Sequence, residues 1–324
     1  MAEPLKAEWC AMTGLKKIVN RQEEAPYREL QELAGQYGYD VHVKIRLADV
    51  LRIEGSGIED ALYSFALQSH FDFLICDENQ DPLFAVEFDG PSHREQVQEA
   101  RDAKKDVLCA RFDLPLLRIN TNHLLKKYNQ ASLLQWIISA WELQKAFDAA
   151  QAQGQIPAEE DFDPIMLWHS GKTLEEVHPH WIALRPRLHI EKLHKEGRLP
   201  VGHACSLTFT DDRDNYRGIE WIDVAADQVV CVESAMREQR FPLYLGDLFR
   251  EVLTVLLYDK LLDFLATGGG AVAPASVSDR LQVMKQQYRF AGSFSGPTAV
   301  NFSMSSADWL DPTLRNKLGL GTAQ

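Results

Sequence analysis

The sequence predicts an α/β protein in which a mixed sheet is flanked by helices, followed by a second domain of the α+β class. Short apolar runs typical of buried strands alternate with segments of helical spacing over residues 20–150. A polar, acidic stretch punctuated by Pro and Gly, residues 151–164, separates the two halves. The 324 residues are also enough for two hydrophobic cores. We therefore predict one domain over 1–150 and a second over 160–324.

The first half supplies its expected helices and strands in a regular order. Residues 26–38 place apolar side chains at helical spacing and stop at Gly35 and Gly38. Residues 40–47 alternate apolar and polar side chains with a period of two, which is typical of a strand. The other expected elements are a helix at 58–70, strands at 71–76 and 82–88, a helix at 94–112, a strand at 114–119 and a helix at 121–147.

The second half is less informative. It contains one long apolar helix, expected at residues 246–266, and a Gly-rich connector at 266–276 that we expect to be flexible. The tail after this connector resembles an appendage more than part of a domain. A zinc site could be drawn from His178, His180, His189, His194, His203 and Cys205. Their spacing fits no compact zinc finger, so scattered surface and core histidines are the simpler interpretation.

Charge and cysteine usage limit the partners and the compartment. The formal net charge of −13 argues against a broadly basic surface for duplex DNA, so any nucleic-acid contact must rest on a local patch, a metal or a partner. The five cysteines form no CxxC pair and are typical of reduced thiols. The chain shows no signal-like start and no run of 18 apolar residues. We expect a cytoplasmic protein that does not enter the membrane.

Three carboxylates fall inside the two expected strands at 71–76 and 82–88, where apolar surface should be buried. Asp72 lies in the first strand, and Glu87 and Asp89 share one face at the end of the second. If the two strands form a hairpin centred between residues 79 and 80, paired residue numbers add to 159. Asp72 then lies directly opposite Glu87, where like charges repel across about 4.5–5.5 Å.

A positive group is needed between these carboxylates. A buried Arg or Lys would serve a purely structural role. A divalent cation with oxygen ligands, Mg²⁺ or Mn²⁺, is the other solution, and converging carboxylates favour it because such clusters mark functional sites. For Asp72 alone, an ion pair would be the simpler interpretation.

These residues, taken together, resemble a known superfamily. An Asp in an apolar strand is followed by Glu87-Phe88-Asp89-Gly90-Pro91-Ser92-His93, by Arg101-Asp102-Ala103-Lys104-Lys105-Asp106 and by the closing run Leu114 to Ile119. This order resembles the PD-(D/E)XK nucleases, and more closely their very-short-patch-repair-like branch and the domain-of-unknown-function family numbered 2726. The resemblance covers roughly residues 20–125 and implies a restriction-endonuclease-like fold.

The resemblance also implies a reaction and a set of roles. It implies hydrolysis of phosphodiester bonds with bound Mg²⁺, or Mn²⁺, held by Asp72, Glu87 and the Phe88 carbonyl. Asp89 stands where the superfamily has its lysine, so that role passes to the next helix, at Lys105 or Lys104. His93 is either a general base, a phosphate contact or a turn histidine. Arg101, Lys104 and Arg111 are the expected nucleic-acid contacts, and Glu29 or Glu32 is the candidate for a glutamate from the first helix.

Two arguments disagree about the lysine. An apolar stripe drawn through Val97, Ala100, Val107 and Leu108 places Lys104 near its centre, pointing at the sheet, and Lys105 at its edge. The resemblance instead assigns the role to Lys105, three residues after Asp102. We favour Lys105.

The sequence therefore predicts a Mg²⁺-dependent endonuclease that acts on DNA more readily than on RNA, in bacterial DNA processing or in defence against foreign DNA. The net negative charge further predicts that a partner protein or a homo-oligomer supplies part of the affinity for nucleic acid. The rival interpretation is a catalytically silent nuclease-like fold that binds nucleic acid or protein. Metal binding distinguishes the two, because only the enzyme must hold the cation.

Overall fold

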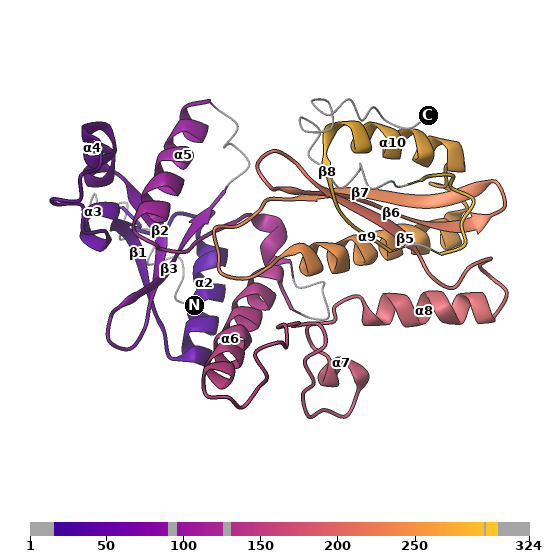
Figure 1. Cartoon of the computed structure of the whole chain (residues 1–324), viewed down its shortest axis with the longest axis horizontal. Coiled ribbons are helices and arrows are strands. Elements are labelled where there is room, and N and C mark those ends of the chain that lie inside the picture. Colours follow the sequence, from indigo (N-terminus) through magenta and orange to yellow (C-terminus); the bar gives the residue numbers. More distant parts are fainter. Residues whose placement is uncertain (1–15, 90–95, 126–130, 295, 304–324) are drawn as a thin grey trace, which may run out of the picture. The chain divides into compact units, whose positions relative to one another are not determined.

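The computed structural model describes residues 16–89, 96–125, 131–294 and 296–303 (Figure 1). The chain divides into two compact units. Unit 1 comprises Met1–Glu142 together with the short segment Gln239–Leu243, and unit 2 comprises Leu143–Glu238 and Tyr244–Gln324. Each unit contains its own four-stranded sheet, and each is described by itself below.

Unit 1 is built on a mixed sheet whose strands follow one another in the order β1-β2-β3-β4. The strands are β1 (Asp40–Arg46), β2 (His70–Cys76), β3 (Pro82–Phe88) and β4 (Leu116–Ile119). The first three pair antiparallel, and β4 joins β3 in parallel. The predicted mixed α/β sheet is confirmed, and β2 and β3 carry the apolar runs because both of their faces are covered.

Helices cover both faces of this sheet. They are α2 (Glu24–Tyr37), α3 (Leu47–Val50), α4 (Asp60–Gln68), α5 (Gln96–Arg111), the 3₁₀ turn η1 (Thr121–Leu124) and α6 (Leu133–Ala152). Leu108 and Cys109 of α5 belong to the same buried cluster as Leu74 and Ala85 of the sheet, together with residues of α3 and α4. The helix predicted over 121–147 is wrong in its first part. There the 3₁₀ turn η1 is a separate element from α6, and residues 126–130 lie outside the described ranges.

The other face of the sheet is aromatic. Tyr27 of α2 stacks on Phe73 with ring centroids 6.1 Å apart, and Trp141 of α6 meets Phe84 edge-on at 5.2 Å. Successive side chains of a strand point to opposite faces of the sheet, so residues 72, 74 and 85 lie on the face opposite to residues 73 and 84. That opposite face is the one covered by α5. This alternation leaves Asp72 and Glu87 on the α5 side of the sheet.

The register of the β2–β3 hairpin agrees with the prediction. Phe73 pairs with Val86, Leu74 with Ala85, and Ile75 with Phe84, so each pair of residue numbers adds to 159. A bulge between Ile75 and Cys76 shifts the register only next to the turn. One step beyond the first pair, the same register sets Asp72 opposite Glu87.

Residues 239–243 complete the edge of this sheet. The backbone N–H of Leu116 in β4 donates to the Arg240 carbonyl over 2.7 Å, and the N–H of Arg118 donates to Oε1 of Gln239 over 2.8 Å. An edge strand exposes a row of unpaired backbone groups. This segment covers part of that row on β4, although it lies more than a hundred residues further along the chain.

Phe241 anchors the segment in the aromatic face. Its ring lies 5.3 Å from those of Phe84 and Trp141, and the residue is 6% exposed. We expect Phe241→Ala to lower the free energy of unfolding by about 3 kcal/mol, because it leaves a cavity between two buried rings. Denaturant unfolding measures this change. Trp168→Ala is the control, since Trp168 is 71% exposed and should cost less than about 0.5 kcal/mol. Equal losses in the two variants would contradict the anchoring role.

Unit 2 contains an antiparallel sheet in the order β7-β6-β5-β8. Its strands are β5 (Cys205–Thr210), β6 (Tyr216–Ala225), β7 (Gln228–Met236) and β8 (Arg289–Phe294), and its helices are α7 (Leu174–Val177), α8 (Leu184–Lys195), α9 (Gly246–Thr267) and α10 (Pro274–Gln287). Residues of α8 and α9 pack against one face of the sheet and residues of α10 against the other (Figure 1). The predicted combination of a second sheet with helices is confirmed.

The segment after residue 276 is not an appendage. Val277 and Leu281 of α10 are fully buried against the sheet, and β8 pairs with β5. The prediction was wrong because the Gly-rich run before α10 was interpreted as the end of the domain, whereas it is only a connection between two packed helices. Residues 304–324 lie outside the described ranges. None of the helices in the described ranges has the length and apolar character needed to cross a membrane.

Unit 2 buries a carboxyl group whose titration should appear in its stability. Burial raises the pKa of Glu220 from 4.5 to about 8, although the Thr254 hydroxyl donates to Oε1 over 2.9 Å. Between these two pH values the folded state holds a proton that the unfolded state has lost. The stability of the protein therefore falls as pH rises through this window.

We expect Glu220→Gln to remove this pH dependence. At about pH 5 the variant should have the same melting temperature as the wild type. At about pH 9, where the wild type carries the buried charge, the variant should have the higher melting temperature. Thermal unfolding at the two pH values measures the difference. The same pH slope in both proteins would show that Glu220 keeps its charge in the folded state.

Candidate active site

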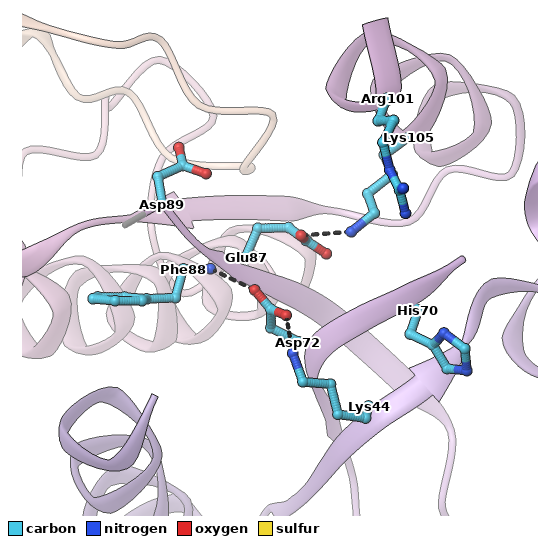
Figure 2. Close-up of a pocket in the computed structure, with 8 residues that line it drawn as sticks. All are labelled: Lys44, His70, Asp72, Glu87, Phe88, Asp89, Arg101 and Lys105. Carbon is cyan, nitrogen blue, oxygen red and sulfur yellow. Dashed lines mark hydrogen bonds and ion pairs between the residues drawn. The ribbon is translucent and has the colours of Figure 1, made fainter. Parts of the chain in front are cut away.

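A pocket of about 480 Å³ opens on the α5 side of the first sheet (Figure 2). Four elements of unit 1 contribute side chains to it: β1, β2, the end of β3, and α5. The residues that line it are Lys44, His70, Asp72, Glu87, Phe88, Asp89, Arg101 and Lys105. The structure thus brings together the predicted residues Asp72, Glu87, Phe88, Asp89, Arg101 and Lys105.

Glu87 is the most deeply buried carboxylate of the pocket. The residue is 5% exposed, and Oε2 accepts from the Lys105 ammonium over 2.5 Å. The other oxygen, Oε1, is buried and has no hydrogen-bond partner among the described residues. Burial raises the pKa of Glu87, Lys105 lowers it, and the neighbouring Asp72 raises it again, with a net result of about 7. Glu87 lines the pocket and therefore has one buried oxygen that no described protein group satisfies.

Asp72 has both of its oxygens engaged. Oδ1 accepts from the Lys44 ammonium over 2.5 Å, and Oδ2 accepts from the backbone N–H of Phe88 over 3.0 Å. Figure 2 shows Lys44 reaching Asp72 from β1 while Lys105 approaches Glu87 from α5. The sequence left two kinds of counter-charge open for this carboxylate pair, a basic side chain or a divalent cation. In the described residues each carboxylate is paired with a lysine.

These groups also fit a hard divalent cation. Carboxylate and carbonyl oxygens are the ligands that Mg²⁺ and Mn²⁺ prefer, and the orphaned Oε1 of Glu87 points to a ligand that is not a protein group. The set is small, however, because the described residues hold no group of three or more His, Cys, Asp or Glu side chains arranged for a metal. Two carboxylates and a backbone carbonyl leave the remaining coordination positions to water or substrate, as is usual for Mg²⁺.

The two neighbouring lysines of α5 point in different directions. Lys105 is 7% exposed and faces Glu87, whereas Lys104 is exposed, with its ammonium 5.5 Å from the ring centre of Phe65 in α4. The apolar stripe predicted for this helix is wrong, since Ala100 and Val107 are exposed. The side chain of Val97 lies outside the described part of the chain.

The error in the stripe has a physical cause. The buried face of α5 runs through Lys105, Leu108 and Cys109, at the spacing i, i+3, i+4. A periodicity search counts only apolar residues, so it cannot find a helix face whose first buried side chain is a lysine. Lys105, to which the resemblance assigns the role, is the one that lines the pocket, and the role itself stays a prediction.

Other predicted contacts lie elsewhere. The Arg111 guanidinium donates to the Ser56 carbonyl over 3.2 Å, and neither Arg111 nor Lys104 lines the pocket. His93 lies outside the described residues. Glu29 accepts from the Ser132 hydroxyl, and neither Glu29 nor Glu32 lines the pocket.

Asp89 belongs to a network around a buried arginine. Arg118 of β4 pairs with Glu87 in the parallel register, and its side chain is 3% exposed. One nitrogen, Nη1, lies 4.0 Å from Asp89 and 3.2 Å from Asp102, while Nη2 lies 2.8 Å from Asp106. A planar guanidinium suits such a task because it presents donors in fixed directions. Arg118 therefore ties α5 to the ends of β3 and β4.

Sequence reasoning missed three residues of this region. Arg118 carried the same signal as Asp72, a charge inside an apolar strand. Lys44 is one of the polar residues in the alternating run 40–47, and its contact with Asp72 depends on the β1–β2 pairing, which the sequence does not reveal. His70, at the start of β2, is exposed and lines the pocket with no local signal that could have singled it out.

The comparisons with known proteins concern this same region. No curated protein and no solved structure matches the chain. One protein-family model does match part of the chain. The match begins before α2 and ends inside α6, so it includes every residue that lines the pocket. The predicted resemblance to this family is thereby confirmed. Residues 15–136 match the family described as Protein of unknown function (DUF2726).

Proposed function

We propose that the pocket is the active site of a divalent-metal-dependent nuclease with a restriction-endonuclease-like domain of the PD-(D/E)XK superfamily. One observation carries the proposal most directly. A carboxylate, Glu87, is buried opposite a second carboxylate, Asp72, and keeps an oxygen without a protein partner among the described residues. Burying like charges in this way is costly for stability, and such arrangements are typical of functional sites.

Asp72, Glu87 and the Phe88 carbonyl would hold the cation. When bound, a divalent cation polarises a phosphoryl oxygen and lowers the pKa of a bound water molecule. The protein's own part is to hold the two carboxylates close together on adjacent strands. The pKa of about 7 for Glu87 implies that this residue loses its proton readily only near or above neutral pH in the absence of a cation.

Lys105 takes the role of the lysine that Asp89 replaces. The ammonium of Lys105 lies in the low-dielectric part of the pocket, where a donor aimed at developing negative charge has its largest effect. Arg101 lies one turn earlier on α5, is exposed, and lines the same pocket. A guanidinium in that position suits a phosphate contact beside the scissile bond.

DNA is the proposed substrate, in bacterial DNA processing or defence against foreign DNA, and this part of the proposal rests on the resemblance. The net charge of −13 limits how tightly the chain alone holds duplex DNA. A partner protein or a second copy of the chain would then supply grip or specificity. Binding to bare duplex should be weak and strongly salt-dependent.

The experiment that tests the proposal compares four substrates. Supercoiled plasmid, linear duplex, single-stranded DNA and RNA are incubated with the protein in Mg²⁺, Mn²⁺ or EDTA. Cleavage of at least one substrate with a metal and none in EDTA supports the proposal. Cleavage that persists in EDTA rules out the metal assignment, and no cleavage of any substrate favours the silent module.

One observation favours that second candidate. Both carboxylates already have a lysine partner, so the charges of the pocket are balanced without a metal. A fold that only binds nucleic acid or protein would need no more than this balance. Titration of the protein with Mn²⁺ separates the two candidates, because a silent module has no need to bind the ion.

A further inference from the structure

Lys44 adopts a backbone conformation that strands avoid. Its φ angle is +54°, in the left-handed region, although it lies within β1. The residues on either side remain paired with β2, Val43 with Phe73 and Ile45 with Phe71. A left-handed conformation costs an L-residue roughly 1–2 kcal/mol. It persists where the surroundings enforce it, and such residues gather at functional sites.

Two carboxylates hold the side chain of Lys44 in this conformation. The ammonium lies 2.5 Å from Oδ1 of Asp72 and 2.8 Å from Oε1 of Glu23. Glu23 is 6% exposed, and Asn20 fixes its carboxylate through its backbone N–H and its side-chain amide. The cation is therefore held on two sides, by the pocket carboxylate and by a second carboxylate that precedes α2.

The two carboxylates of the pocket differ in how open they are to a ligand. Lys105 contacts only Oε2 of Glu87 and leaves Oε1 without a partner. Lys44 and the Phe88 N–H together engage both oxygens of Asp72. A cation that bridges the two carboxylates displaces no described partner at Oε1 of Glu87, but it meets an ammonium at Oδ1 of Asp72.

We propose that Lys44 competes with the divalent cation for Asp72 and so sets the metal affinity of the pocket. This inference rests on the proposed function. Lys44 neutralises Asp72 when no divalent cation is bound, and Glu23 retains the ammonium at the pocket wall when one takes its place. Removal of the ammonium should therefore tighten metal binding rather than weaken it.

The conformation of Lys44 makes Lys44→Gly an informative variant. Glycine adopts positive φ without a steric penalty, so the substitution deletes the ammonium and relieves the backbone at the same time. Asp113→Gly is the matched control, because Asp113 has the same φ of +54°, is exposed and does not line the pocket. Lys44→Met, which keeps most of the side-chain stem, serves if the glycine variant does not fold.

The test is a titration of each protein with Mn²⁺, followed by calorimetry or by the electron paramagnetic resonance signal of free Mn²⁺. We expect Lys44→Gly to bind Mn²⁺ about fivefold more tightly than the wild type, which corresponds to about 1 kcal/mol, the upper end for a partly exposed ion pair. Asp113→Gly should bind like the wild type. Adding Asp72→Asn to Lys44→Gly should abolish the gain.

Each other outcome overturns the inference. Equal or weaker binding by Lys44→Gly shows that the lysine does not compete, and so does a gain that survives Asp72→Asn. If the wild type still cleaves only with metal in those cases, the proposed function stands and this inference alone fails. If neither protein binds Mn²⁺ and no substrate is cleaved, both fail together.

Discussion

Glu87→Gln is expected to reduce phosphodiester cleavage by at least about a hundredfold at a fixed Mg²⁺ concentration, the scale on which a single charged contact in an enclosed site contributes to turnover. The amide removes the charge that would hold the cation beside Asp72. Its oxygen can still accept from the Lys105 ammonium, which now lies 2.5 Å from Oε2. The fold should therefore survive, and circular dichroism together with thermal unfolding checks that it does.

The control for this variant lies on the same hairpin. Glu78 is exposed in the turn between β2 and β3, so Glu78→Gln changes the net charge equally without touching the pocket. Asp72→Asn should behave like Glu87→Gln. Full activity in either pocket variant, with EDTA suppressing cleavage as usual, would end the assignment of these two carboxylates to a metal.

Lys105→Met should lower turnover by about a hundredfold while leaving Mn²⁺ affinity close to that of the wild type. The ammonium is placed to stabilise negative charge on the phosphate, an effect of about 10²–10³ for a well-placed donor. Metal affinity should change little because Lys105 contacts only Oε2 of Glu87 and Oε1 has no partner among the described residues. Methionine retains the volume of the side-chain stem, so the packing around Glu87 should survive the substitution.

Lys104→Met is the neighbouring control on α5. Lys104 is exposed and contacts the Phe65 ring, so its loss should cost at most about 1 kcal/mol of stability and leave turnover unchanged. Single-turnover cleavage at saturating Mg²⁺ separates the two variants. Loss of turnover in Lys104→Met with normal turnover in Lys105→Met would mean that the buried lysine serves only the fold.

The central hairpin of the site could be predicted from the sequence alone. Period-two alternation and a turn rich in Asn and Asp specify which residues of β2 and β3 share a face, and a one-residue slip would have moved every side chain to the other face. The cross-strand placement of Asp72 and Glu87 follows from those local rules. The order of helices and strands in unit 1 follows in the same way.

The contacts that depend on distant pairing could not be predicted. Lys44 meets Asp72 only because β1 pairs with β2 in one register, and its left-handed φ has no signature in a lysine. Arg118 lies beside Glu87 because β4 joins β3 after the α5 crossover. Periodicity also misplaced the buried face of α5, since ion pairs rather than apolar contacts fill its centre at Lys105.

The segment that covers the edge of β4 also has a consequence for folding during synthesis on the ribosome. The last strand of the first sheet ends at Ile119, whereas its edge is covered by residues that begin at Gln239. At 5–20 residues per second, the roughly 120 residues between them take about 6–24 s to be synthesised. During that interval the edge of β4 lacks the segment that later covers it. The nascent chain thus passes through a stage, set by translation speed, in which its first unit is most open to chaperones and to pairing with other chains.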